Sequence, residues 1–115
     1  MMTKTDKKIE NTIREALTEV CELALENVNG FKWLTHLVAN YKIVSDSIAI
    51  ICVFETNDDL SKAIETHQNE FLYQKIKEKL SAVSIEVKNI QQQVRFDSEE
   101  ACEQYHGGKW VERLK

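Results

Sequence analysis

The sequence has no proline and only three glycines among its 115 residues. Clusters of proline and glycine mark flexible linkers between domains, and the sequence has no such cluster. Glycine-rich loops bind the phosphate groups of nucleotides, and no such loop is indicated either. Internal repeats and low-complexity tracts are also missing. We therefore expect residues 1–115 to form a single domain around one hydrophobic core.

Long apolar runs are missing as well. The longest one, Ile48 to Phe54, is far shorter than the roughly 20 residues that a bilayer-spanning helix needs. The polar beginning, MMTKTDKKIE, lacks the apolar stretch of a signal peptide. Together these features predict a cytoplasmic protein that makes no contact with a membrane.

Cysteine is scarce, and its distribution argues against both disulfides and metal binding. Cys21, Cys52 and Cys102 are odd in number and widely separated, which predicts reduced thiols. Cys102 and His106 lie four residues apart on a predicted helix, but a structural zinc site needs four ligands and no second pair exists. No nucleophile can be matched with an activating base. We expect no metal, no cofactor and no enzymatic activity.

Basic charge is in deficit, with 15 Lys and Arg against 19 Asp and Glu and a net charge of −4. No general positive field would attract nucleic acid, so binding would need a local basic patch. Residues 71–90 hold four basic and two acidic side chains, an excess of two. A solvated surface is therefore favoured, and nucleic-acid binding stays the alternative. The residues that it would use are Lys75, Lys79, Lys88, Arg95 and Arg113.

What the sequence does contain is 43% hydrophobic residues in clear periodic patterns. Apolar side chains recur every three or four residues from residue 6 to residue 29, which predicts an amphipathic helix that ends at Asn29-Gly30. Residues 33–39 and 47–55 resemble strands. The second is β-branched and apolar at nearly every position and should be central in its sheet. The first also fits one face of a helix.

The second half of the chain predicts shorter elements. A capped helix begins near Thr56, and its apolar face changes direction so sharply that we expect a break at residues 67–70. Residues 83–87 alternate between apolar and polar like a strand, which residues 94–96 would extend or pair with. Residues 97–105 predict a short helix.

These elements predict an α+β fold. It would comprise a long N-terminal helix, a small, mostly antiparallel sheet of three or four strands, a broken middle helix and a short C-terminal helix. Helices would cover one face of the sheet. The other face would be solvated, covered by the C-terminal segment, or used for self-association as a homodimer.

Six aromatic or imidazole side chains fall outside the regular apolar pattern and are candidates for a binding surface: Trp33, His36, Tyr41, Tyr105, His106 and Trp110. Tryptophan is enriched at interaction sites, although each of these rings could instead cap an edge of the core. The register of the first strand decides which of Trp33 and His36 is exposed, and the sequence leaves it open. We expect a non-enzymatic binding or regulatory module that contacts a protein or small ligand.

Three stretches carry a resemblance to a known family: FKWLTHLV, CVFETNDDL and VRFDSEEACEQYHGGKW. Together they resemble a small family of uncharacterised bacterial cytoplasmic proteins along nearly the whole chain. Members are often labelled Fis-family transcriptional regulators, which implies a role in transcription. The order of helix, strand, strand, helix and strand is also similar to K homology-like modules, but their glycine-bearing nucleic-acid loop is missing here.

Overall fold

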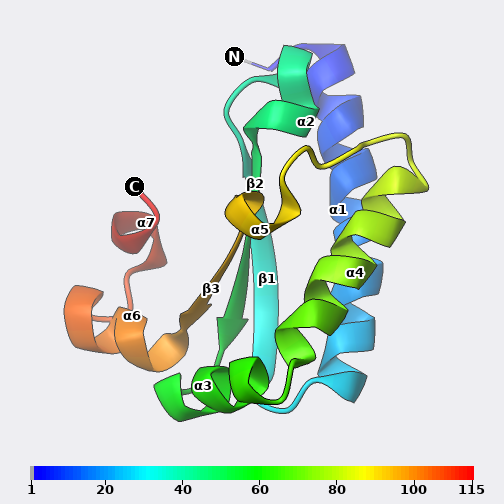
Figure 1. Cartoon of the computed structure of the whole chain (residues 1–115). Helices are drawn as coiled ribbons and strands as arrows, with labels where there is room; N and C mark the ends of the chain where they lie inside the picture. The colour runs from blue at the N-terminus through cyan, green and yellow to red at the C-terminus, as the bar shows by residue number, and fades with distance from the viewer. Residues whose placement is uncertain (1) are drawn as a thin grey trace.

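The computed structural model describes residues 2–115 and confirms the α+β class, with a three-stranded sheet between two groups of helices (Figure 1). Helices α1 and α4 lie against one face of the sheet, and α6 and α7 lie at the other. The elements in chain order are α1 (Lys4–Asn27), β1 (Phe31–Val38), η1 (Tyr41–Ile43), α2 (Val44–Ser47), β2 (Ile48–Phe54), α3 (Asn57–Glu65), α4 (Gln68–Ser81), α5 (Ile90–Gln93), β3 (Val94–Ser98), α6 (Glu99–His106) and α7 (Trp110–Arg113).

The sheet has the order β1-β2-β3 and is mixed. Strand β1 pairs with β2 in the antiparallel sense, whereas β3 runs parallel to β2 because the chain crosses over through α3, α4 and α5 before it returns. The central position predicted for β2 is confirmed, and six of its seven residues are buried. The first predicted strand is also confirmed, since β1 runs through eight extended residues rather than a helical turn.

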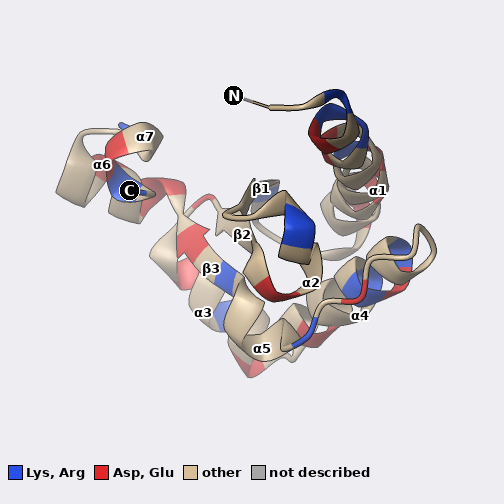
Figure 2. Ribbon diagram, turned by 90° about the horizontal axis from the view of Figure 1, so that it is seen from above, with Lys and Arg blue, Asp and Glu red and all other residues tan. Residues whose placement is uncertain are grey.

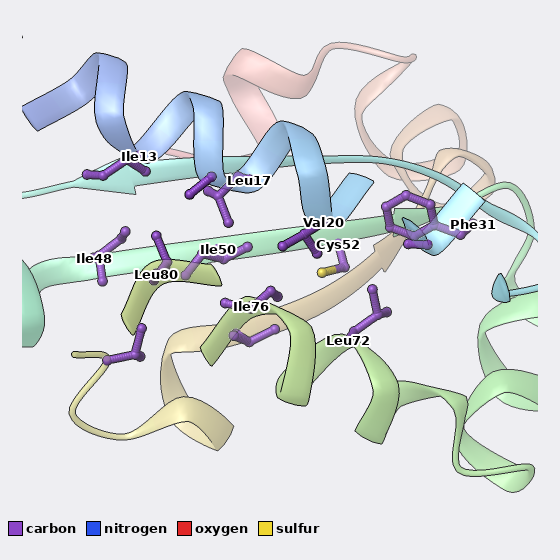
Figure 3. Packing of buried hydrophobic residues seen from close by; sticks show 14 of the residues in the cluster. Ile13, Leu17, Val20, Phe31, Ile48, Ile50, Cys52, Leu72, Ile76 and Leu80 are labelled. Atoms are coloured by element: carbon purple, nitrogen blue, oxygen red, sulfur yellow. The ribbon is translucent and has the colours of Figure 1, made fainter. Parts of the chain in front are cut away.

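The main core lies between α1, α4 and the sheet (Figure 3). Alternate side chains of β2 point toward the two helices, which present one apolar stripe each. Each large aliphatic side chain buried there contributes about 1.5–3 kcal/mol relative to an exposed one. The residues that meet at its centre are Ile13, Leu17 and Val20 of α1, Ile48, Ile50 and Cys52 of β2, and Leu72, Ile76 and Leu80 of α4.

The break predicted in the middle helix is confirmed, because α3 ends at Glu65 and α4 begins at Gln68. Between them His67 takes a left-handed conformation, with φ of 61° and ψ of 22°. This turn rotates the chain so that Ala63 and Leu72, from the two helices, both reach the same core.

The strand predicted at residues 83–87 is wrong. The alternation holds only in part, since Ile85 and Val87 are buried and Glu86 between them is exposed but Val83 is exposed as well, and within residues 2–115 this segment pairs with no strand. Its backbone is engaged elsewhere: the Ile85 N–H donates to the Leu80 carbonyl at the end of α4, and the Lys88 N–H donates to the Ser45 carbonyl. Strand β3 supplies the third strand instead.

Of the three fates expected for the second sheet face, the structure shows cover by the C-terminal segment at one end. Trp110 of α7 packs on Trp33 of β1, and Arg113 binds Asp97 of β3. Among residues 2–115, no helix is both long and apolar enough to cross a bilayer.

The left-handed turn at His67 generates the first prediction. Glycine adopts this conformation without a Cβ penalty, so His67→Gly should raise the free energy of unfolding by up to about 1 kcal/mol. The matched control is Lys77→Gly at an exposed position inside α4, which should lower it by about 0.5–1 kcal/mol. Urea unfolding of both variants checks the pair. A loss of stability in His67→Gly would contradict the assigned turn.

Candidate functional site

The register of β1 answers which way Trp33 and His36 point. Trp33 lies opposite Val53, and His36 lies opposite Ile50, so the two side chains are on different faces of the sheet. His36 faces α1, and Trp33 faces α7. The six residues predicted to bind therefore divide into two clusters, one on each face.

The first cluster is centred on Glu10 of α1, whose carboxylate bridges β1 and η1. Its Oε1 lies 2.6 Å from His36 Nε2, and its Oε2 accepts a 2.7 Å hydrogen bond from the Tyr41 hydroxyl. Arg14 adds a longer contact of 3.7 Å on the same helix. The side chains of His36 and Glu10 are only 10% and 19% exposed, so this network is shielded from water.

The electrostatics of this cluster keep Glu10 ionised. Burial by itself would raise the pKa of Glu10, but the hydrogen bond from Tyr41 and the interactions with His36 outweigh it and lower the pKa below its usual value. Because a carboxylate only accepts, His36 Nε2 carries the proton of their hydrogen bond. The same contact with Glu10 raises the pKa of Tyr41 to about 12, since the neutral hydroxyl is the donor.

The second cluster fastens α6 and α7 to the sheet. The Trp33 indole N–H donates to Glu99, and its ring meets Trp110 edge to face with centroids 4.9 Å apart. Arg113 donates to both oxygens of Asp97, at 2.6 and 2.8 Å. These contacts account for Trp33 and Trp110 as residues that hold the C-terminal segment in place.

Two further predicted residues complete this second cluster around Arg113. His106 Nδ1 lies 3.2 Å from Arg113 Nη1, and the ring of Tyr105 lies 5.9 Å from the Arg113 guanidinium carbon. Tyr105 is nevertheless 69% exposed. The guanidinium is thus surrounded by contacts within the chain.

The five basic residues considered for nucleic acid lie on four different segments, since only Lys75 and Lys79 share a helix, and four of them contact carboxylates. Lys75 contacts Glu78 at 3.6 Å, Lys79 contacts Glu19 at 3.9 Å and Lys88 contacts Asp46 at 3.2 Å, while Arg113 binds Asp97. Arg95 has no ion pair within residues 2–115. Figure 2 shows basic and acidic positions interspersed along α4 rather than a continuous basic stripe. The structure therefore does not gather these cations into one patch.

A groove runs between α1 and the outer edge of β1, next to the Glu10 cluster. Its volume is about 390 Å³. One wall is the exposed side of α1 and the other is the middle of the edge strand. The residues that line it are Glu10, Arg14, Leu17, Thr18, Cys21, Glu22, Leu34, Thr35 and His36.

The backbone of β1 faces this groove with groups that β2 does not use. The Ala39 N–H donates toward Ser47 at the β2 side, and antiparallel ladders alternate, so the N–H and C=O groups of Leu34, His36 and Val38 point away from β2. The Leu34 backbone N–H is already engaged by the Cys21 sulfur, so the outward N–H groups that have no partner within residues 2–115 are those of His36 and Val38. Within residues 2–115, β1 pairs with β2 alone.

Sequence reasoning missed Glu10, although a signal was present. Glu10 precedes Leu17 by seven residues and Cys21 by eleven, almost two and three full turns of helix, so it lies within the apolar stripe of α1. A carboxylate at such a position needs partners. The sequence does not say that His36 and Tyr41 would supply them, because both come from other elements.

The three cysteines are free thiols, as predicted. Burial raises the pKa of both Cys21 and Cys52, so neither sulfur is an activated nucleophile. No group of three His, Cys, Asp or Glu side chains in the described chain is arranged to hold a metal ion.

Comparison of the chain with models of protein families, with curated proteins and with solved structures found no match.

The bond between Tyr41 and Glu10 generates a pH-dependent prediction. Tyr41→Phe should lower the free energy of unfolding by about 1 kcal/mol near neutral pH. The pKa of Tyr41 is raised from 10 to about 12, so this difference should be complete below pH 10 and vanish as the pH rises to about 12. Urea unfolding of both proteins from about pH 8 to about pH 12 measures it. Tyr105→Phe, at an exposed ring, is the control, and a pH-independent difference for Tyr41→Phe would refute the bond.

Proposed function

We propose that this chain is a non-enzymatic binding module that captures an extended segment of a partner protein as an additional strand along β1. The observation that carries the proposal is the outward-facing backbone of His36 and Val38 beside a groove that α1 walls on its far side. Unpaired strand edges are templates for main-chain hydrogen bonds, and adjoining pockets select the side chains of the added strand.

The dimensions of a sheet support this mode of binding. An added strand would lie about 4.8 Å from β1 and place every second side chain toward the groove. The floor there is formed partly by Leu17, Cys21 and Leu34 and would accept an apolar side chain. The Glu10 network with His36 and Tyr41 holds one end of β1 against α1, which preorganises the edge and reduces the entropy lost on binding.

The charges along the groove indicate which kind of partner segment would bind there. The contacts with Arg14 and His36 already balance Glu10, whereas Glu22 lines the groove without an ion pair in residues 2–115. The neighbouring carboxylate of Glu26 on α1 is also exposed. The expected partner segment is therefore extended and carries one apolar side chain for the floor and a basic side chain near Glu22.

The sequence-based predictions about nucleic acid, cellular location, a regulatory role and a homodimer stay predictions. Nucleic-acid binding is the less favoured alternative, because four of its five candidate cations already contact carboxylates. A cytoplasmic location, the resemblance to the bacterial family labelled as Fis-type regulators, and a regulatory role are compatible with capture of a partner peptide. A homodimer would compete with that partner if it formed through the same edge.

Selection from a random-sequence peptide library tests the proposal. Enriched peptides should carry apolar and basic side chains, and a labelled enriched peptide should bind saturably by fluorescence anisotropy. Thr18→Tyr places a bulky ring in the groove and should weaken binding at least about tenfold. The matched control, Asn11→Tyr, adds the same ring to an exposed site on α1 outside the groove and should bind as the parent protein does.

Amide hydrogen exchange by NMR distinguishes strand addition from other modes of binding. The bound peptide should slow exchange at His36 and Val38, whose N–H groups point outward, and leave Thr35 and Leu37 unchanged. No enriched peptide, or equal affinity for Thr18→Tyr and Asn11→Tyr, would overturn the proposal. Sedimentation at high micromolar concentration separates the homodimer, and salt-sensitive binding of labelled duplex DNA would favour the nucleic-acid alternative.

A further inference from the structure

A second hollow lies at the end of the molecule where α1 begins, and it shares no lining residue with the groove. Its volume is about 580 Å³. Three segments line it: the first turns of α1, the stretch η1–α2, and the loop that follows α4. Volumes between about 300 and 1,000 Å³ are typical of sites for small molecules.

The walls of this hollow are held together by specific contacts. The Lys88 backbone N–H donates to the Ser45 carbonyl at 3.2 Å, and the Lys88 ammonium lies 3.2 Å from Asp46. Gln93 donates to the carbonyls of Ser45 and Ile48, both at 2.9 Å. The loop after α4 is therefore tied to α2, and α5 is tied to both α2 and β2.

Five of the twelve lining residues are aliphatic, and two of these five are exposed. Ile9, Val44 and Ile85 form the interior side, whereas Ile43 is 51% exposed and Val83 is 38% exposed. Contact of these two exposed side chains with water is unfavourable. An apolar ligand that covered them would gain about 25 cal/mol of binding free energy for each Å² removed from water.

The charge at the rim is positive. Lys8 and Lys42 both line the hollow, and neither has an ion pair in the described chain. The one carboxylate in the lining, Asp46, contacts Lys88 and is thereby compensated. An occupant that matches this distribution has an apolar body and one anionic group.

We infer that this hollow binds a free aliphatic carboxylate, with the chain on the aliphatic lining and the carboxylate between Lys8 and Lys42. The inference does not rest on the peptide groove, because the two sites share no lining residue and would bind by different chemistry. A concavity lined by three segments suits a single dissolved molecule better than the flat surface of a bilayer.

Calorimetric titration with decanoate below its micelle concentration tests the inference. Decanoate should bind with a Kd on the order of 0.1–1 mM. Decyltrimethylammonium, which has the same chain and the opposite charge, should bind at least about fivefold more weakly. NMR shifts on adding decanoate should centre on Ile43 and on residues 83–85.

Matched variants separate the contribution of the two lysine charges from that of the apolar lining. The double variant Lys8→Gln, Lys42→Gln should weaken decanoate binding about fivefold, whereas Lys32→Gln, Lys109→Gln removes the same charge elsewhere and should have no effect. Val83→Asn should weaken binding without changing either lysine. Unfolding curves verify that each variant is folded.

Three results would overturn the inference. The first is equal binding of decanoate and decyltrimethylammonium, and the second is decanoate binding that both lysine double variants reduce equally. The third is co-sedimentation with vesicles that contain phosphatidylglycerol while free decanoate does not bind, which would assign the charged rim to a lipid surface. Peptide binding in the groove is unaffected by any of these outcomes, so the two proposals fail separately.

Discussion

Strand β2 carries apolar side chains at all seven positions, so neither of its faces can lie against water without a large cost in free energy. One face is covered by the long N-terminal helix α1 and by α4, which lies in the crossover between β2 and β3. The other is covered at one end by α6 and α7, which are held by the Trp33–Trp110 and Asp97–Arg113 contacts. The placement of α1, α4, α6 and α7 follows from the need to shield this one strand.

The position of β1 is a consequence of that constraint. Because β2 must be central, β1 becomes an edge strand with one unpaired side. Natural proteins usually protect such edges, and here α1 stands alongside it without closing the gap. In the proposed function, α1 hinders unspecific strand pairing at the edge of β1. A segment that fits between α1 and β1 could still bind there.

Polar networks stabilise the two ends of β1 in different ways. Glu10 is a partly buried carboxylate that His36 and Tyr41 compensate by hydrogen bonds, which joins three elements through one side chain. At the other face, Glu99 accepts from Trp33. Polar contacts of this kind specify a unique arrangement because leaving either partner unpaired carries a desolvation penalty. Seven of the 15 Lys and Arg side chains contact carboxylates within residues 2–115, and Lys8 and Lys42 at the α1 end are among those that do not.

The sequence by itself determined the elements whose signals are local. The 3.6-residue period of α1, the apolar run of β2 and the change of apolar face near His67 depend only on neighbouring residues. The strand expected at residues 83–87 shows the limit, since Ile85 and Val87 alternate correctly but their backbone bonds go to α4 and α2. Only the tertiary structure decided the pairing of β3 with β2, the opposite orientations of Trp33 and His36, and the union of Glu10 with partners 26 and 31 residues away. Those outcomes depend on strand register and on contacts between distant segments, and a side-chain period of two residues carries no information about which strand lies alongside.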